Sequence, residues 1–161
     1  MSIPSIYLET TIFNFPFVDD APQYKTDTLK LFAEIKEGKF KPFTSTLVTE
    51  ELELTKNEER LAKMKALIND YKITVIEPND EMKELADTYI KVGIIPERFL
   101  TDAFHIAVAT VYGLDFIVSL NFRHIVKHKT IIQTEAINAI LGFGRIYIHT
   151  PAEVINYEKD A

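Results

Sequence analysis

The sequence has 161 residues, of which 47% are hydrophobic and 26% are charged, and its formal net charge at pH 7 is −6. A chain of this length and apolar content can bury a sizeable core, so we expect a single domain over residues 1–161 and exclude a disordered or collagen-like chain. The absence of cysteine excludes disulfides and cysteine-ligated metal sites. The negative charge argues against a broad basic surface that binds nucleic acids without specificity.

The chain shows no sign of membrane insertion or export. The N-terminal sequence MSIPSIYLE lacks a basic segment followed by a long apolar run. No uncharged apolar stretch approaches the roughly 18 residues of a membrane span. Together with the missing cysteines, which fit a reducing compartment, this predicts a cytoplasmic protein with no membrane partner.

Short apolar runs of β-forming residues alternate with longer segments of helical periodicity along the chain. Nearly continuous apolar strands separated by helices are typical of a parallel sheet covered on both faces. We therefore predict an α/β fold, a three-layer α/β/α domain with a central, mainly parallel sheet. The predicted strands cover residues 6–8, 41–46, 73–77, 116–120 and 145–149.

The longer segments have the spacing of amphipathic helices and end at glycines, as helices commonly do. Between 47 and 71 the pattern predicts one or two helices, interrupted near the sequence TKNEE. Thr101 or Asp102 is expected to cap the helix that leads through Gly113 into the fourth strand. The other predicted helices are the segment that ends at Gly38 and the segment that begins at Asn79 and ends at Gly93.

Polar side chains follow the ends of several predicted strands. Glu9 follows the first strand, Glu51 lies in the helix after the second, and Asn121 follows the fourth. In open α/β sheets, sites form beyond the carboxyl ends of the strands, so these side chains are candidates for one site. Periodicity does not decide whether Asp102, at the start of the preceding helix, reaches the same edge.

These segments resemble the motifs of the PIN-domain family, the nuclease fold of many toxins from bacterial toxin–antitoxin pairs. The family's order and approximate spacing are matched over nearly the whole chain. The resemblance implies a ribonuclease that hydrolyses phosphodiester bonds in an RNA substrate with Mg²⁺ or Mn²⁺, forms a homodimer, and has a small antitoxin as partner. The matching motifs are IYLETTIF at 6–13, TSTLVTEEL at 44–52 and TDAFHIAVATVYGLDFIVSLNF at 101–122.

The resemblance also implies roles for individual residues. Glu9 and Asp102 would bind the metal directly, Glu51 would hold a metal-bound water, and Asn121 would orient water or substrate. Glu9 stands where the family usually has Asp, and the uncharged Asn121 stands where many members have Asp, which favours one metal over two. The residues expected to position the substrate are Thr10, Ser45, Arg123 and His124.

Carboxylates that lie close together repel one another, and a bound cation reduces this repulsion. Two such charges about 4 Å apart repel each other by several kcal/mol at an effective dielectric constant near 20. A hydrated Mg²⁺ or Mn²⁺ removes this repulsion. It also activates a bound water and stabilises charge on the leaving oxygen of a phosphodiester.

A purely structural interpretation is open for each of these residues. Glu9 can be an exposed charge at the end of a strand, and Asp102 can be only a helix cap. One of Glu50 and Glu51 is expected to be a solvated residue on a helix face. His105 is expected to be packed and hydrogen-bonded rather than to act as a catalytic base.

Two other functional hypotheses compete with a nuclease. A PIN-like fold that has lost catalysis and serves as a binding or regulatory module is motivated by Glu9 and Asn121. The other hypothesis is a different α/β hydrolase or phosphatase, but the sequence contains no recognisable arrangement around a nucleophile for such an enzyme.

His124 and His128 have the spacing of two zinc ligands on a helix, but no Glu partner accompanies them, so no zinc site is expected. The aromatic residues after the first strand, expected to cover the core or an oligomer contact, are Phe13, Phe15 and Phe17.

Overall fold

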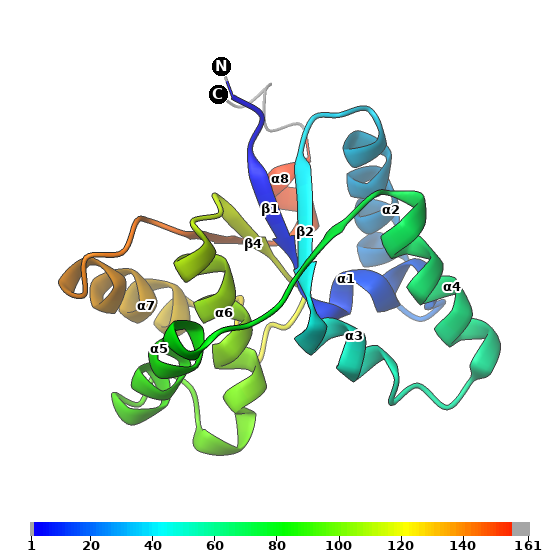
Figure 1. The fold of residues 1–161 in the computed structure, drawn as a ribbon. Coiled ribbons are helices and arrows are strands. Elements are labelled where there is room, and N and C mark those ends of the chain that lie inside the picture. Colours follow the sequence, from blue (N-terminus) through cyan, green and yellow to red (C-terminus); the bar gives the residue numbers. More distant parts are fainter. Residues whose placement is uncertain (1, 156–161) are drawn as a thin grey trace.

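The computed structural model describes residues 2–155 and places five strands in one sheet (Figure 1). The strand order is β3-β2-β1-β4-β5, and neighbouring strands are all parallel. The three-layer α/β/α architecture predicted from the sequence is confirmed. The strands are β1 (Ser5–Leu8), β2 (Lys41–Ser45), β3 (Thr74–Ile76), β4 (Phe116–Val118) and β5 (Tyr147–His149).

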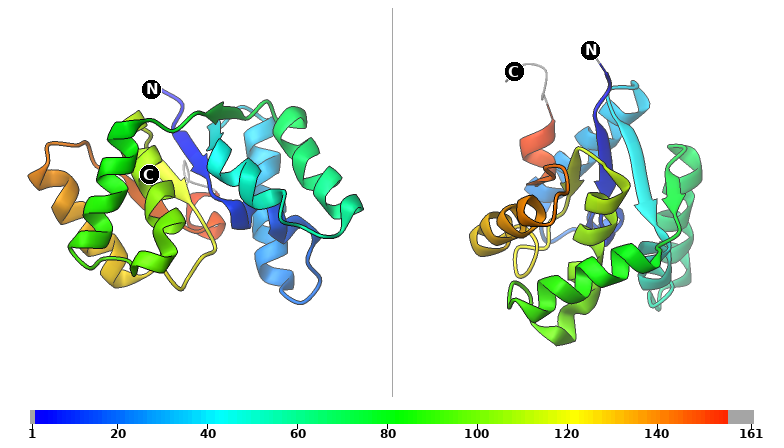
Figure 2. Two further views of the ribbon diagram at one scale, coloured as in Figure 1. Left: turned by 60° about the horizontal axis from the view of Figure 1, so that its bottom comes forward. Right: turned by 60° about the vertical axis from the view of Figure 1, so that its left-hand side comes forward.

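The helices divide between the two faces of the sheet. They are α1 (Thr10–Asn14), α2 (Pro22–Lys36), α3 (Thr46–Leu52), α4 (Glu58–Asp70), α5 (Asp80–Lys91), α6 (Leu100–Tyr112), α7 (His128–Ile140) and α8 (Pro151–Val154), with 3₁₀ turns η1 (Phe15–Phe17) and η2 (Glu97–Phe99). The chain moves toward one edge of the sheet from β1 to β3 and toward the other from β3 to β5. Because parallel crossovers are right-handed, the two sets of helices cover opposite faces. Figure 1 and the left view of Figure 2 show α5, α6 and α7 on one side and α2, α3 and α4 on the other.

The centre of the core lies where β1 meets α6. Ile6, Tyr7 and Leu8 of β1 are completely buried. Ala103 and Ala107 of α6 are also completely buried, and their small side chains let the helix approach the sheet closely. Burial of each large aliphatic side chain stabilises the fold by about 1.5–3 kcal/mol.

Every helix in the described part of the chain is too short or too polar to span a bilayer.

Most helix boundaries follow the sequence signals. The segment 47–71 forms two helices, α3 and α4, and the side chain of Asn57 caps the second. Asn79 caps α5, as predicted, by accepting a hydrogen bond from the backbone of Met82 at 2.9 Å. Gly93 has the positive φ that is typical of the residue after a helix.

The predicted start of α6 is wrong. The N-cap is Phe99, and no side chain caps this helix, so neither Thr101 nor Asp102 has that role. Asp102 lies in the first turn, where its negative charge interacts favourably with the helix dipole. Because α6 runs antiparallel to the strands, this first turn lies at the carboxyl edge of the sheet, which settles the position of Asp102 that periodicity left open.

Gly113 supports a first prediction. Its φ of +79° is left-handed, and it forms the tight turn between α6 and β4. We expect Gly113→Ala to lower the free energy of unfolding by about 1 kcal/mol, because a Cβ is strained in this conformation. Urea denaturation measures the change. The matched control is Gly144→Ala, at an exposed glycine with no left-handed φ and open space around it. Equal losses of unfolding free energy in Gly113→Ala and Gly144→Ala would contradict the strain expected at Gly113.

Candidate active site

The candidate site lies at the topological switch point of the sheet. β1 and β4 are neighbours, and the segments that follow them lead to helices on opposite faces. The backbone N–H of Glu9 donates to the carbonyl of Val118 at 3.2 Å, so the carboxyl ends of the two strands are held together. In open α/β sheets this is the place where ligands bind.

Glu9 is buried and fully hydrogen-bonded at one oxygen. Its side chain is only 3% exposed, so the interpretation as an exposed strand-end charge is wrong. Oε1 accepts hydrogen bonds from the Thr11 backbone (3.2 Å), the Thr11 hydroxyl (2.6 Å) and the Ser119 hydroxyl (2.7 Å). Burial raises the pKa of Glu9, while the charge of His105 and these hydrogen bonds oppose the rise. The side chain caps α1, so the extra methylene of Glu folds back onto the chain.

Glu51 is joined to a chain of buried polar groups. Its Oε1 accepts a hydrogen bond from the Thr10 hydroxyl (2.8 Å) and lies 2.6 Å from Nε2 of His105. The other ring nitrogen of His105, Nδ1, lies 2.6 Å from the Tyr7 hydroxyl, which is 2.7 Å from the Ser45 hydroxyl. This polar chain links β1, β2, α3 and α6. Glu50, the neighbour of Glu51, is exposed.

His105 is the positive group among the acids. It is completely buried and hydrogen-bonded, which confirms its expected packing role. Burial lowers its pKa, but the hydrogen bond with Glu51 and the charges of Glu9, Glu51 and Asp102 outweigh burial and raise the pKa overall. Burial alone would raise the pKa of Glu51, yet the interaction with His105 lowers it. The pair therefore favours an imidazolium beside a carboxylate.

Asp102 is held by the loop that follows β4. Burial raises the pKa of Asp102, opposed by the charges of His105 and His124 and by a hydrogen bond from the Asn121 side chain. The side-chain oxygen of Asn121 accepts from the His124 backbone at 3.0 Å. The side-chain oxygen of Asn121 therefore fixes this loop, and the side chain acts on Asp102.

Glu9, Glu51 and Asp102 carry the oxygen atoms that could bind a divalent metal. Carboxylate oxygens are the ligands that Mg²⁺ prefers, and it usually keeps several waters when one or two carboxylates bind it. Glu9 and Glu51 each accept hydrogen bonds at Oε1 and none, from the described residues, at Oε2. Within residues 2–155, however, no three His, Cys, Asp or Glu side chains are placed as a ready ligand set. The described residues therefore offer no closed three-ligand cage, and Oε2 of Glu9 and Oε2 of Glu51 are carboxylate oxygens without a hydrogen bond from them.

The remaining predicted residues have different surroundings. Ser45 is completely buried, where its hydroxyl caps α3, and Arg123 is exposed on the loop after β4. Sequence reasoning did not assign Tyr7, Thr11 or Ser119 to the site. Thr11 and Ser119 stand just past strand ends, a position that could have marked them, but Tyr7 lies inside an apolar strand and gave no signal.

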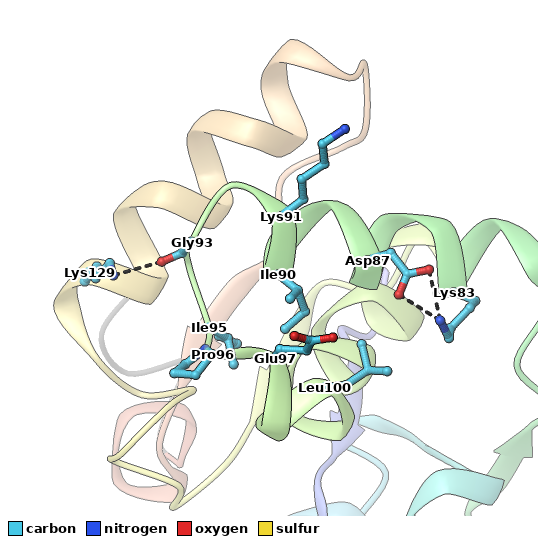
Figure 3. A pocket seen from close by; sticks show the side chains of 10 residues that line it. All are labelled: Lys83, Asp87, Ile90, Lys91, Gly93, Ile95, Pro96, Glu97, Leu100 and Lys129. Atoms are coloured by element: carbon cyan, nitrogen blue, oxygen red, sulfur yellow. Dashed lines mark hydrogen bonds and ion pairs between the residues drawn. The ribbon is translucent and has the colours of Figure 1, made fainter.

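A cavity of about 690 Å³ lies away from the acids, between α5, the segment 93–100 and Lys129 (Figure 3). Its lining contains none of the candidate site residues. Lys83 pairs with Asp87 at 2.7 Å, and Lys129 donates to the carbonyl of Gly93 at 2.9 Å. Because Glu9, Glu51 and Asp102 interact with His105 at the sheet edge, we place the candidate site there and not in this cavity.

Comparison with known proteins supports the fold. No family model matches the sequence, and no curated protein matches it. Among solved structures, the chain is similar to one in the crystal structure of VapBC2 from Rickettsia felis bound to a DNA fragment from their promoter. The TM-score is 0.56 and the identity 15%, over 91% of this chain and 98% of that chain. At this identity the likeness shows the fold, and it confirms the expected PIN-like fold.

The Glu51–His105 pair has a defined pH dependence. The lowered pKa of Glu51 gives a stabilisation that is present above its ordinary value of 4.5 and lost as the pH falls through the folded-state value. The raised pKa of His105 gives a stabilisation that is present below its ordinary value of 6.5 and lost as the pH rises through the folded-state value. Both contributions are complete between pH 4.5 and 6.5.

We therefore expect Glu51→Gln to lower the free energy of unfolding most within that window. The difference from the unsubstituted protein should narrow at lower and at higher pH. Chemical denaturation in metal-free buffer at a series of pH values measures it. Glu50→Gln removes the same charge at an exposed position and serves as the control. A Glu51→Gln difference that stays constant with pH would exclude the proposed ion pair.

Proposed function

We propose that this chain is a metal-dependent ribonuclease that hydrolyses phosphodiester bonds of RNA with Mg²⁺ or Mn²⁺. The observation that supports the proposal is that Glu9, Glu51 and Asp102, from distant parts of the sequence, all act on the buried His105. Glu51 also acts directly on Asp102. The switch-point position and the PIN-like fold support the same conclusion.

The residues have distinct roles in this proposal. Glu9 and Asp102 would hold the metal, and Glu51 would hold a water bound to it. A Mg²⁺ or Mn²⁺ ion held there would supply an activated water and polarise the phosphodiester. The raised pKa values of Glu9 and Asp102 indicate that their negative charges are costly where they lie, so a cation would stabilise both.

The protein's own groups orient these acids. Thr11 and Ser119 fix one oxygen of Glu9. Asn121 is a positioning residue that holds Asp102, rather than a group free to orient water. His105 holds Glu51 and reduces the repulsion among the carboxylates until the metal is bound.

Asp102→Asn is the principal test of the nuclease activity. We expect it to lower the rate of RNA cleavage by about 100-fold or more, because loss of an outer contact alone typically costs 10–100-fold at metal sites. Cleavage of labelled RNA in Mg²⁺ or Mn²⁺ measures the rate. Glu50→Gln, at an exposed position one residue from Glu51, should leave the rate unchanged. No cleavage of any RNA with either metal, or equal cleavage by Asp102→Asn, would refute the proposal.

The second candidate function is a PIN-like binding module without catalysis. It is favoured by one observation: Oε1 of Glu51 is already bound by Thr10 and lies against His105. Calorimetric titration distinguishes the two candidates, since the module should bind no Mg²⁺ even at millimolar concentration. Binding that is lost in Asp102→Asn supports the nuclease.

We also propose a toxin role with a small antitoxin as protein partner and a homodimeric, cytoplasmic form. The likeness to the VapBC2 structure from Rickettsia felis supports an antitoxin partner. Light scattering of the purified protein tests the homodimer. Co-purification with a small protein expressed alongside it tests the partner.

A further inference from the structure

Two arginines from separate segments lie against one aromatic ring. The guanidinium carbon of Arg98 is 5.1 Å from the centre of the Phe99 ring, and that of Arg123 is 5.3 Å from it. Arg98 belongs to η2, before α6, whereas Arg123 lies in the loop after β4. Both side chains are exposed. The ring therefore holds two cationic groups together at the surface.

These two guanidinium groups have no partner of opposite charge in the described part of the chain. The other arginines are occupied: Arg60 donates to the carbonyl of Phe17 at 3.2 Å, and Arg145 lies 3.5 Å from Glu135. Of the three lysines that line the cavity in Figure 3, Lys83 and Lys129 have hydrogen-bond partners, as described above. No hydrogen bond or ion pair within residues 2–155 uses the side chain of Arg98 or Arg123.

The two arginines are connected to Asp102 through Phe99 and His124. His124 packs its ring on Phe99, with ring centres 3.9 Å apart, and its charge acts on Asp102. Its Nε2 atom is buried and has no hydrogen-bond partner among the described residues. His124 is therefore half-buried and packs against the ring, with its Nε2 atom turned away from solvent. The exposed cations of this region are Arg98, Arg123 and Lys127, and their neighbours Glu97 and Phe122 are exposed as well.

We propose that Arg98 and Arg123 form an arginine clamp, organised by Phe99, that binds the phosphate backbone of single-stranded RNA next to the acid cluster. The proposal rests on the ribonuclease function proposed above and identifies the part of the substrate that the protein holds. A chain with a net charge of −6 repels RNA, and carboxylates at the site add to the repulsion. Local positive charge beside the acids offsets it.

The chemistry of the side chains favours phosphate as the ligand. A guanidinium group is planar and always charged, and it donates two parallel hydrogen bonds to phosphate oxygens. Stacking on Phe99 restricts both groups to the ring surface, so less side-chain freedom is lost on binding. Arg98 lies four residues before Asp102, and Arg123 lies two residues after Asn121. Both are therefore attached to segments that carry the acids and their supports.

The test is the salt dependence of RNA binding by the full chain. Anisotropy of a short labelled single-stranded RNA is measured in EDTA, which prevents metal-dependent cleavage, over a range of salt concentrations. For single strands, the slope of log K against log salt changes by about 0.7 for each phosphate contact. We expect Arg98→Ala and Arg123→Ala each to reduce the slope by about 0.7, and the double variant by about 1.4.

Arg145→Ala is the matched control. Arg145 also stacks on an aromatic ring, 4.4 Å from the centre of Tyr147, but β5 begins there, at the other end of the sheet. Its replacement removes the same charge and should leave the slope unchanged. A slope that falls equally in Arg145→Ala, or that does not fall in the double variant, overturns the clamp. The clamp is also overturned if the double variant loses affinity for duplex DNA but keeps its affinity for single-stranded RNA.

Cleavage assays on the same proteins separate this proposal from the ribonuclease proposal. If the protein cleaves RNA and the double variant keeps the salt slope of the unsubstituted protein, the clamp proposal is refuted and the ribonuclease proposal is supported. If RNA binds with the expected slopes but is never cleaved with Mg²⁺ or Mn²⁺, the clamp stands and the nuclease fails. If RNA is neither bound nor cleaved, both fail.

Discussion

The buried carboxylate of Glu9 is the constraint on which the rest of the site depends. A charge at the end of a buried strand is tolerated only when hydrogen-bond donors or opposite charges surround it. Here the donors are Thr11, just after β1, and Ser119, just after β4. Satisfying one carboxylate therefore also fixes the two strand ends against each other. Thr11 adds a further link by accepting from the backbone of Leu120 at 2.8 Å.

The same constraint explains the placement of a histidine in the core. Three acids close enough to affect one histidine require positive charge nearby, and His105 supplies it from the inner face of α6. Its two ring nitrogens connect Glu51 on one side with Tyr7 on the other. The acids are thus held in place by the protein's own groups, and in the proposed nuclease this would reduce the rearrangement that binding requires.

Sequence patterns predicted the fold better than the site. The strands were predictable because apolar runs and glycine stops act locally, and each observed strand falls within or close to its predicted run. Asp102 was harder to place, because its position depends on the direction of α6 relative to the sheet. Tyr7 could not be assigned at all, since a tyrosine in an apolar strand looks like core until its hydroxyl partners, Ser45 and His105, are known.

The polar chain from Ser45 to Glu51 makes the candidate site part of the unit that folds cooperatively. Active sites built on mobile loops can loosen while the core stays intact. Here the groups that orient the acids cross β1, β2, α3 and α6, and Tyr7, Ser45 and His105 have no exposed surface. A substitution at Tyr7, Ser45 or His105 is therefore expected to change stability together with the proposed activity. Stabilising substitutions should be found outside these positions.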